Sequence, residues 1–538
     1  MFIKKNHLAL ILGLIVLIGA SLRLYKLNEN PPSLYWDEVS LGYNAYSILT
    51  TAHDEHGEFM PISRFIAFGD YKPPGYIYAI VPFMALLGIG EVAVRLPSVI
   101  SGIAFIFLSF YLVRTLGGSK KLGLFSAFAI AFSPWSIQLS RVAFEAHLAA
   151  VFNLLGVILF IKSTKKPAML VGSAIFFVAS FYTFNANRII APLLVLLLFL
   201  LYRKEILRSG KWLVISGIVG GLLLAPSVPY LMTRESRLRF QEVSIFNELS
   251  IIEKSNEQIA RNGNTLLARI IHNRRVYFGL EFLKHYTDHF KGEFLFIKGD
   301  RNPRLSIQSV GELYWFELPL LVIGSYLLIM SRSKTAKLLI GWLAISIIPA
   351  ATARETPHML RIASSLPVWY IFIAYGWNFV VSKFNEHSTK WKNIGKLVVA
   401  SILIFTVGYY LHQLWRHYPE EWSGEWQYGY KELVQKVERL ESNYDAIYIR
   451  DHFGRPYIYF LFYGKVSPTQ YLAKRRATRD WYGFWDVQGF GKYSFGKIAQ
   501  DPPQKSLLIT GPGNFEKDKL IDTVKSPKGD ILFEIGAL

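Results

Sequence analysis

Long uninterrupted runs of apolar residues constrain this chain more than any other feature of its sequence. A run of about 17–25 such residues can cross the hydrocarbon core of a bilayer as one helix. Eleven runs can be drawn, at 8–25, 93–114, 121–138, 146–161, 168–185, 189–202, 211–230, 313–330, 336–352, 363–381 and 396–412. The composition agrees, because 52% of the 538 residues are hydrophobic and only 18% are charged. The sequence therefore predicts a polytopic α-helical membrane protein with about 11 transmembrane helices.

Basic residues between the runs predict the orientation, because cytoplasmic loops carry an excess of Lys and Arg. The run 74–88 is short and broken by Pro82 and Gly88, so we expect it to lie in the interface or re-enter. All six basic clusters then fall on one side: Lys4/Lys5, Lys120/Lys121, Lys162/Lys165/Lys166, Arg203/Lys204/Arg208/Lys211, Arg332/Lys334/Lys337 and Lys383/Lys390/Lys392/Lys396. This arrangement predicts a multi-pass plasma-membrane protein with a cytoplasmic N-terminus and an extracytoplasmic C-terminus. The basic residues behind the net charge of +20 then determine the orientation of the chain in the membrane, and no nucleic-acid partner is expected.

Three long segments are expected outside the cytoplasm under this topology. The first outer loop, 26–92, should hold interfacial helices, and the segment 231–312 combines helical patterning with a turn-rich close, GDRNPRLS. Beyond a transmembrane domain at 1–412, the tail 413–538 begins with the helical stretch KELVQKVERLES. Four short β-prone runs follow, YDAIYIRDH, YIYFLFYG, SLLITGPG and DILFEIG, separated by Gly, Pro and charge. The tail is therefore predicted to be a small extracytoplasmic α/β domain.

Six titratable groups crowd the first outer loop, close to the membrane: Asp37, Glu38, Asp54, Glu55, Asp70 and Lys72. Charge at a bilayer is costly unless it faces water or a substrate, so the group indicates an active site. For each residue alone, a solvated loop position is the alternative. Asp37, just before the amphipathic stretch VSLGYNAYSILTTA, is a candidate general base, with Glu38 as a second catalytic acid. A helix cap followed by a first-turn acid is an equally simple explanation of this pair.

Basic groups in two places suit a phosphate. Lys72 precedes the rigid pair Pro73-Pro74 and could meet a lipid phosphate, although snorkelling to headgroups explains most interfacial lysines. Arg354, His358 and Arg361 lie just before the run 363–381. Arginine binds phosphate oxygens in a bidentate manner, and a protonated imidazole can donate, although a polar loop with headgroup contacts is the alternative.

Several further residues are candidates with weaker support. Glu145 heads an apolar helix and could bind a metal or the acceptor, or could simply be an acid favoured by the helix dipole. Asp54, Tyr71 and Arg141 are candidates for acceptor binding or for structural roles. The stretch His53–His56 resembles a metal cluster in composition, but its spacing fits a hydrated surface turn better.

Short motifs in one order resemble those of the bacterial GT-C glycosyltransferases: WDE, DEHG, YKPPGY, RLPS, SRVAFEAH, GDRNPR and TPHMLR. Over about residues 8–380 the chain is most similar to the branch with protein O-mannosyltransferases and the lipid A aminoarabinose transferase. The resemblance implies a membrane enzyme that moves a sugar, with inversion, from a polyprenyl-phosphate donor to an extracytoplasmic lipid, glycan or protein acceptor. It implies Asp37 as base, with Lys72, His358 and Arg361 on the leaving phosphate. Glu145 stands where the family often has a second acid, commonly Asp.

The resemblance leaves metal use and two other functions open. Some relatives use a divalent metal such as Mg or Mn and others do not. A flippase or transporter of a lipid-linked glycan is one alternative, and a noncatalytic glycan- or lipid-binding scaffold is another. Transporters place ionisable groups within their spans, often with internal repeats. Here the charges gather at one membrane face, which favours the transferase.

Overall fold

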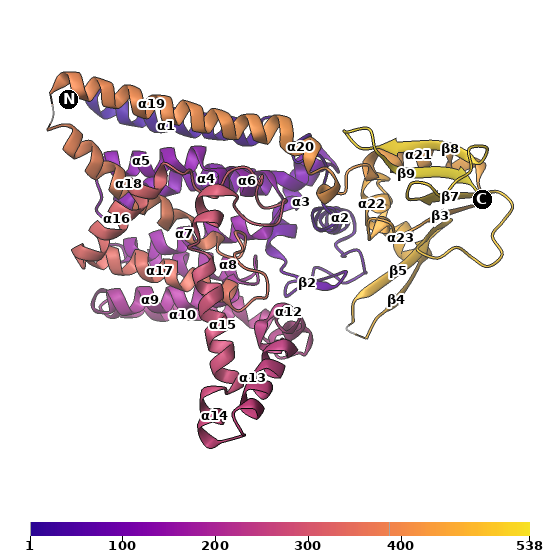
Figure 1. The fold of residues 1–538 in the computed structure, drawn as a ribbon, viewed down its shortest axis with the longest axis horizontal. Helices are drawn as coiled ribbons and strands as arrows, with labels where there is room; N and C mark the ends of the chain where they lie inside the picture. Colours follow the sequence, from indigo (N-terminus) through magenta and orange to yellow (C-terminus); the bar gives the residue numbers. More distant parts are fainter. Residues whose placement is uncertain (1, 387, 482) are drawn as a thin grey trace. The chain divides into compact units, whose positions relative to one another are not determined.

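The computed structural model describes residues 2–386, 388–481 and 483–538, and the chain divides into two compact units (Figure 1). One comprises Met1–Leu22, Ser101–Leu139 and Glu145–Tyr410, and we name it the helical unit. The other comprises Arg23–Ile100, Ser140–Phe144 and Leu411–Leu538, and we name it the mixed unit.

Helices at the predicted apolar runs dominate the helical unit. They are α1 (Phe2–Leu24), α4 (Glu91–Thr115), α5 (Lys120–Phe132), α6 (Pro134–Arg141), α7 (Glu145–Ser163), α8 (Met169–Phe181), α9 (Asn187–Leu207), α10 (Gly210–Leu224), α16 (Glu317–Ser331), α17 (Lys334–Ala351), α18 (Leu366–Phe384) and α19 (Thr389–His412). Six helical stretches of the described residues are long and apolar enough to cross a membrane, or seven if α5 and α6 count as one. The apolar helical bundle is thus confirmed, and the number of crossings stays a prediction.

The predicted run 121–138 is bent and not straight. Its two helices, α5 and α6, meet at 55° where Pro134 follows Ser133. Proline has no N–H and its ring crowds the preceding turn, so a helix usually breaks or kinks there. The predicted runs 168–185 and 313–330 correspond to the shorter apolar helices α8 and α16, of 13 and 15 residues.

Two glycines let α16 and α18 pack at close range. A Cβ built on Gly324 would lie 1.8 Å from the carbonyl oxygen of Phe372, and one built on Gly376 would lie 1.9 Å from that of Leu320. Membrane helices associate through such close packing of small residues, because lipid offers no hydrophobic drive between helices. The crossing of α16 and α18 therefore requires glycine at both positions.

Between α10 and α16 the helical unit continues in short helices, as the patterning of 231–312 predicts. They are η1 (Ala225–Ser227), α11 (Val228–Leu231), α12 (Glu235–Val243), η2 (Ile245–Asn247), α13 (Leu249–Arg261), α14 (Leu266–Ile271), α15 (Arg274–Asp288) and η3 (Glu293–Ile297), and η4 (Ala363–Ser365) later precedes α18. In Figure 1, α15 runs across the direction of α9 and α17, and α13 and α14 lie at its far end.

The mixed unit begins with α2 (Trp36–Thr51), a small hairpin of β1 (Phe65–Ala67) and β2 (Asp70–Lys72), and α3 (Gly75–Leu87). The predicted amphipathic helix is present as α2, but most of its residues are buried. The run 74–88 forms α3, a helix of 13 residues that contains Pro82, shorter than a span requires.

The rest of the mixed unit is a sheet with helices, as predicted for the tail. Its helices are η5 (Gln413–His417), α20 (Tyr418–Glu421), η6 (Gly424–Trp426), α21 (Tyr430–Leu440), η7 (Glu441–Asn443), α22 (Pro456–Tyr463) and α23 (Pro468–Lys474). Its strands are β3 (Ala446–Ile449), β4 (Arg475–Arg479), β5 (Trp485–Phe490), β6 (Tyr493–Phe495), β7 (Ser506–Thr510), β8 (Leu520–Lys525) and β9 (Ile531–Ala537). The sheet order is β4-β5-β6-β3-β7-β9-β8, and β3 runs parallel to β6 and β7.

One strand prediction for the tail is wrong. The run YIYFLFYG forms the helix α22, which begins at Pro456. Proline suits the first position of a helix, where an N–H would have no partner. The residues from Pro456 to Phe462 are all buried, and an apolar run with no exposed face does not distinguish a strand from a buried helix.

Candidate active site

The first cluster of the candidate site lies in the mixed unit, at the start of α2 and the end of the β1–β2 hairpin. The Nζ of Lys72 lies 3.0 Å from Oδ1 of Asp37 and 3.3 Å from Oδ2 of Asp70. Asp70 and Lys72 share one face of β2, because side chains two apart in a strand point the same way. The side chains of Asp37 and Lys72 are 29% and 13% exposed, so their ion pair borders solvent. The predicted base and the predicted phosphate-binding lysine are therefore in direct contact.

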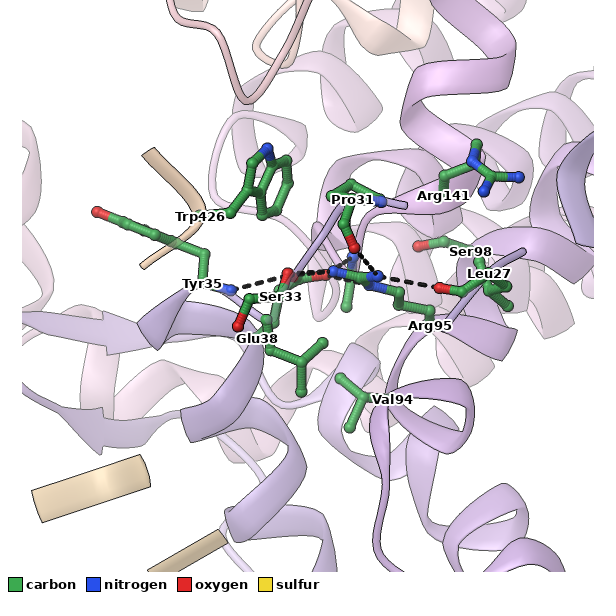
Figure 2. Close-up of polar contacts among 12 residues, drawn as sticks. Leu27, Pro31, Ser33, Tyr35, Glu38, Val94, Arg95, Ser98, Arg141 and Trp426 are labelled. Atoms are coloured by element: carbon green, nitrogen blue, oxygen red, sulfur yellow. Dashed lines mark hydrogen bonds and ion pairs between the residues drawn. The ribbon is translucent and has the colours of Figure 1, made fainter. Parts of the chain in front are cut away.

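Glu38, the neighbour of Asp37, is fully buried, and its carboxylate accepts several hydrogen bonds (Figure 2). Its carboxylate accepts from the backbone N–H groups of Tyr35 and Ala143 at 3.0 and 2.7 Å. It also accepts from Nε and Nη2 of Arg95, each at 3.2 Å. The carboxylate of Glu38 therefore binds groups of the protein itself, and it fixes the first turn of α2, which carries Asp37.

Two buried arginines hold the chain that leads into α2. Arg95 lies between Glu38 and three backbone carbonyl oxygens, as Figure 2 shows, and its guanidinium lies 5.8 Å from the ring centroid of Trp426. The carbonyl groups that accept from Arg95 are those of Leu27, Pro31 and Ser33. Arg141 donates in the same way to the carbonyl groups of Arg23, Lys26 and Asn30. The contacts of Arg141 within this unit are thus those of a structural residue.

A third arginine, Arg455, lies beside the Asp37–Lys72 pair. The centre of its guanidinium lies 4.5 Å from the ring centroid of Phe68 and 5.7 Å from that of Trp36. A Cβ built on Gly69 would lie 3.4 Å from its Nη2. Among the residues that the structure describes, none offers Arg455 a hydrogen bond or an ion pair. This half-buried cation stacks on Trp36, the residue before Asp37, and on Phe68, two residues before Asp70, and no described residue is its counter-ion.

The stretch His53–His56 is not the hydrated surface turn that the sequence predicts. Its last three residues are buried, and Arg475 of β4 donates to the carbonyl oxygens of Glu55 and His56. Trp485 stacks on the ring of His56 with centroids 5.1 Å apart. The prediction fails because these partners come from strands more than 400 positions further along the chain.

Burial changes the acidity of this stretch. Desolvation raises the pKa of Glu55 to about 8 and that of Asp54 to about 6. Oε1 of Glu55 accepts from the side-chain amide of Asn44, and Oδ1 of Asp54 accepts from two backbone N–H groups of its own turn. Tyr71 is also buried, with its ring 5.0 Å from that of Phe484. Asp54 and Tyr71 are therefore both buried within the mixed unit.

The second cluster lies in the helical unit, in the loop that joins α17 to α18. The backbone N–H of His358 donates to Nε2 of His289 at 3.2 Å, and that of Met359 donates to Oδ2 of Asp300 at 2.7 Å. Nδ1 of His289 lies 2.9 Å from the carbonyl oxygen of His285, so it carries the ring proton. Burial lowers the pKa of His289 to about 4, which keeps this ring neutral. The loop is therefore held in place by buried groups.

Two predicted phosphate-binding residues lie in this loop. Nδ1 of His358 is 3.8 Å from Oδ2 of Asp300, whose pKa burial raises to about 6. Arg361 is half-buried, and its Nη1 donates to the carbonyl oxygen of Glu355 at 3.1 Å. His358 and Arg361 thus belong to one ordered loop within the helical unit.

The other two predicted residues of this unit lie in different surroundings. Arg354 is exposed, with its Nε 2.9 Å from Oε2 of Glu248. Glu145 is the buried first residue of α7. No group of three or more His, Asp or Glu side chains among the described residues could hold a metal ion.

Sequence reasoning missed three groups that shape these clusters. Arg95 lies in the motif RLPS and Asp300 in the motif GDRNPR. Both motifs belong to the family resemblance, but no role is predicted for either residue. Arg455 carries no such signal, because its partners Trp36 and Phe68 are about 400 positions away in the chain.

The sequence and the fold are similar to those of known glycosyltransferases. Residues 13–183 match the family described as dolichyl-phosphate-mannose-protein mannosyltransferase. This range contains Asp37, Lys72, Arg141 and Glu145. None of the curated proteins compared with the chain is a match.

Among solved structures, ArnT from Cupriavidus metallidurans in the apo state has a TM-score of 0.53 at 10% identity, and the likeness covers 99% of this chain and 98% of that one. ArnT bound to undecaprenyl phosphate gives a TM-score of 0.51 at 11% identity, with the same two coverages. The oligosaccharyltransferase AglB from Archaeoglobus fulgidus, in complex with an inhibitory peptide and a dolichol-phosphate, gives 0.52 at 13% identity over 86% of this chain. The chain spans 64% of AglB.

Together the family match and the fold confirm the class that the sequence resemblance predicts. The chain has the fold of the GT-C glycosyltransferases AglB and ArnT, and its residues 13–183 match the protein mannosyltransferase family. This class consists of membrane enzymes that use lipid-linked sugar donors.

Proposed function

We propose that this protein transfers a sugar from a polyprenyl-phosphate donor to a hydroxyl group of an extracytoplasmic lipid, glycan or protein, with inversion at the anomeric carbon. The observation that carries the proposal is the 3.0 Å contact between the Asp37 carboxylate and the Lys72 ammonium, at a partly exposed position. A lipid-phosphate donor agrees with the ligands in the ArnT and AglB structures, undecaprenyl phosphate and dolichol-phosphate.

In this mechanism Asp37 takes the proton of the acceptor hydroxyl as its oxygen attacks the anomeric carbon. The bond from that carbon to the phosphate oxygen breaks, and polyprenyl phosphate leaves with the bonding electrons. An ammonium has three N–H donors, so Lys72 can bind a phosphate oxygen while it still orients Asp37. A fixed cation at the departing phosphate stabilises the transition state more than the ground state, because negative charge grows there.

We assign Glu38 a positioning role, because its buried carboxylate is bonded to Arg95 and to the backbone N–H groups of Tyr35 and Ala143. The guanidinium of Arg455 is a second candidate for binding an anionic group of the substrate, because two rings hold it and no residue in the described part of the chain pairs with it. In the helical unit, we propose that His358 and Arg361 bind phosphate. Arg354 suits this role less well, since it is exposed and paired with Glu248.

Purified protein in nanodiscs, supplied with undecaprenyl-phosphate-linked mannose or aminoarabinose, tests the proposal. We expect sugar transfer to be accompanied by an equal amount of undecaprenyl phosphate. Lys72→Met should lower kcat/KM by about a hundredfold or more, the usual cost of a fixed group that stabilises transition-state charge. Arg455→Met keeps the stacking volume but removes the charge, and should raise the donor KM roughly tenfold, the value of one charge-assisted hydrogen bond.

Two surface cations of the mixed unit serve as matched controls. Lys26 forms an exposed ion pair with Glu29, and Arg450 is exposed at the end of β3. Lys26→Met and Arg450→Met should leave transfer unchanged. If Lys72→Met transfers sugar as well as Lys26→Met does, Lys72 has no part in binding the phosphate.

A further inference from the structure

The helical unit carries a projecting group of helices, α13, α14 and α15, which we name the arm. The end of α15 is fixed to α17 and to the loop after it. The hydroxyl of Tyr286 donates to the carbonyl oxygen of Ala344 in α17 at 3.0 Å, and Nδ1 of His285 lies 2.8 Å from the carbonyl oxygen of Ala353, two residues beyond α17. Elsewhere the arm extends away from α17, as Figure 1 shows. Its location is therefore set by the end of a helix that is long and apolar enough to span a membrane.

Two helices of the arm, α14 and α15, carry exposed apolar residues. Those at the tip lie in α14, are 52–76% exposed, and are Leu266, Leu267, Ile270 and Ile271. On α15 the exposed apolar residues are spaced four and three apart, and they are Val276, Leu280 and Leu283. Residues at this spacing share one face of a helix. Large apolar side chains that are exposed in such numbers mark a site of contact with a partner or a membrane.

Cations lie beside these apolar residues in the sequence. Arg269, Arg274 and Arg275 are exposed, and within the described residues none of them forms an ion pair. By contrast, Arg261 on α13 is paired with Glu257 at 2.6 Å. Apolar residues flanked by unpaired arginines are typical of helices that lie in the interface of an anionic bilayer. The arginine fork suits the phosphate of a lipid headgroup.

The place where the arm contacts α17 and its following loop agrees with a position in the membrane interface. Ala344 lies seven residues before Ala351, the last residue of α17, and at 1.5 Å per residue this is about 10 Å along the helix. Tyr286 therefore contacts α17 within its apolar stretch, whereas His285 contacts Ala353, two residues beyond the helix end, where a bilayer passes from hydrocarbon to headgroups. In Figure 1, α15 leads from this point across the direction of α17, the course of a helix that follows a membrane surface.

We propose that the arm lies on the bilayer surface, at the membrane face to which the loop with His358 and Arg361 also belongs. The apolar residues of α14 and α15 enter the boundary between headgroups and acyl chains, and Arg269, Arg274 and Arg275 bind phosphates of anionic lipids. The arm is thereby a lipid-binding site outside the clusters that we assign to sugar transfer, and it does not depend on that assignment.

The chain contains no cysteine, so single-cysteine variants of the full protein can be labelled directly. We would attach the fluorophore NBD to Leu267→Cys and Leu280→Cys, and to Asn256→Cys as a control on the exposed polar part of α13. Each labelled protein is placed as a single copy in nanodiscs of phosphatidylcholine and phosphatidylglycerol. Quenching is then compared between lipids that carry a nitroxide on the acyl chain and iodide in the water.

We expect positions 267 and 280 to be quenched strongly by the nitroxide lipid and weakly by iodide, with the reverse at position 256. Equal iodide quenching at all three positions would overturn the proposal. Protection that arises only when a nanodisc holds two copies would assign the exposed apolar residues to contact with a second copy of the chain and also overturn it. The thermal unfolding temperature of each variant, compared with wild type, shows whether the label has disturbed the fold.

A charge variant tests the lipid class. With Arg269, Arg274 and Arg275 all changed to Gln, nitroxide quenching at position 280 should no longer increase as phosphatidylglycerol replaces phosphatidylcholine. The matched Arg261→Gln change should leave that increase in place, because Arg261 is already paired. The same increase in both variants would contradict a role for the three arginines.

Discussion

At the scale of single residues, Asp37 and Glu38 are adjacent acids with different surroundings. Asp37 contacts Lys72 at a partly exposed position, whereas Glu38 is buried and bonded to Arg95 and two backbone N–H groups. A buried ion pair that loses one partner leaves a charge without compensation, which is strongly destabilising. We therefore propose that Glu38 contributes to the site through the conformation of α2, and that Asp37 is the acid that meets a substrate.

Glu55 gives a prediction for the pH dependence of stability. Its pKa is about 8 in the folded protein, raised by burial from 4.5. Between these values the folded protein keeps a proton that the unfolded chain releases, so stability falls as pH rises, by up to about 1.4 kcal/mol per pH unit. Glu55→Gln cannot lose a proton, and it keeps the oxygen that accepts from Asn44. The unfolding temperature of Glu55→Gln should therefore rise relative to that of wild type as the pH increases from 6 to 8.

Thermal unfolding in detergent at pH 6, 7 and 8 measures this difference. Asp54, with a pKa of about 6, titrates mainly below this window and is unchanged in both proteins. Glu29→Gln, at an exposed ion pair of the same unit, is the control and should follow wild type. Parallel curves for wild type and Glu55→Gln would show that Glu55 is ionised in the folded state.

At the scale of elements, the crossing of α16 and α18 predicts a position where even one methyl group is too large. The Cβ of Gly376→Ala would meet the carbonyl oxygen of Leu320 at 1.9 Å, and a backbone atom cannot move aside without shifting a helix. Overpacking of this kind costs about 1–3 kcal/mol. We expect a clear loss of thermal stability in detergent.

The matched control is Gly408→Ala on α19, where a Cβ meets nothing within 4 Å. Alanine favours a helix over glycine by about 1 kcal/mol, so this change should be neutral or stabilising. If both variants unfold at the same temperature, α16 and α18 are not in the close contact described.

The sequence predicts a helix well where its residues form a long apolar run or place their apolar side chains on one face. The apolar runs gave the helices of the bundle, and the stretch after Asp37 gave α2. The sequence does not predict α22. Every position from Pro456 to Phe462 is buried, so no alternation of apolar and polar residues distinguishes a helix from a strand. The prediction fails again for Asp54 to His56, because their burial depends on Arg475 and Trp485 of a distant hairpin.

At the scale of the whole molecule, each compact unit is built from segments that lie far apart in the chain. The first loop, Arg23–Ile100, belongs to the same unit as the tail, although more than 300 residues separate them. Arg455 is the clearest consequence, since this residue of the tail stacks on Trp36 and Phe68 of the first loop. Motif order predicted Asp37 and Lys72, which lie within one loop, but no local pattern could link Arg455 to them.

The central claim is that Asp37 acts as the base in sugar transfer from a polyprenyl-phosphate donor. Its most direct test is transfer of a radiolabelled sugar from such a donor by wild type and Asp37→Asn in the same nanodiscs, with donor binding measured alongside. The change keeps the size of the side chain and removes its basicity. Because general-base catalysis contributes about 10²–10⁴-fold, we expect transfer to fall by that factor while the donor still binds. Equal transfer by the two proteins would contradict the account.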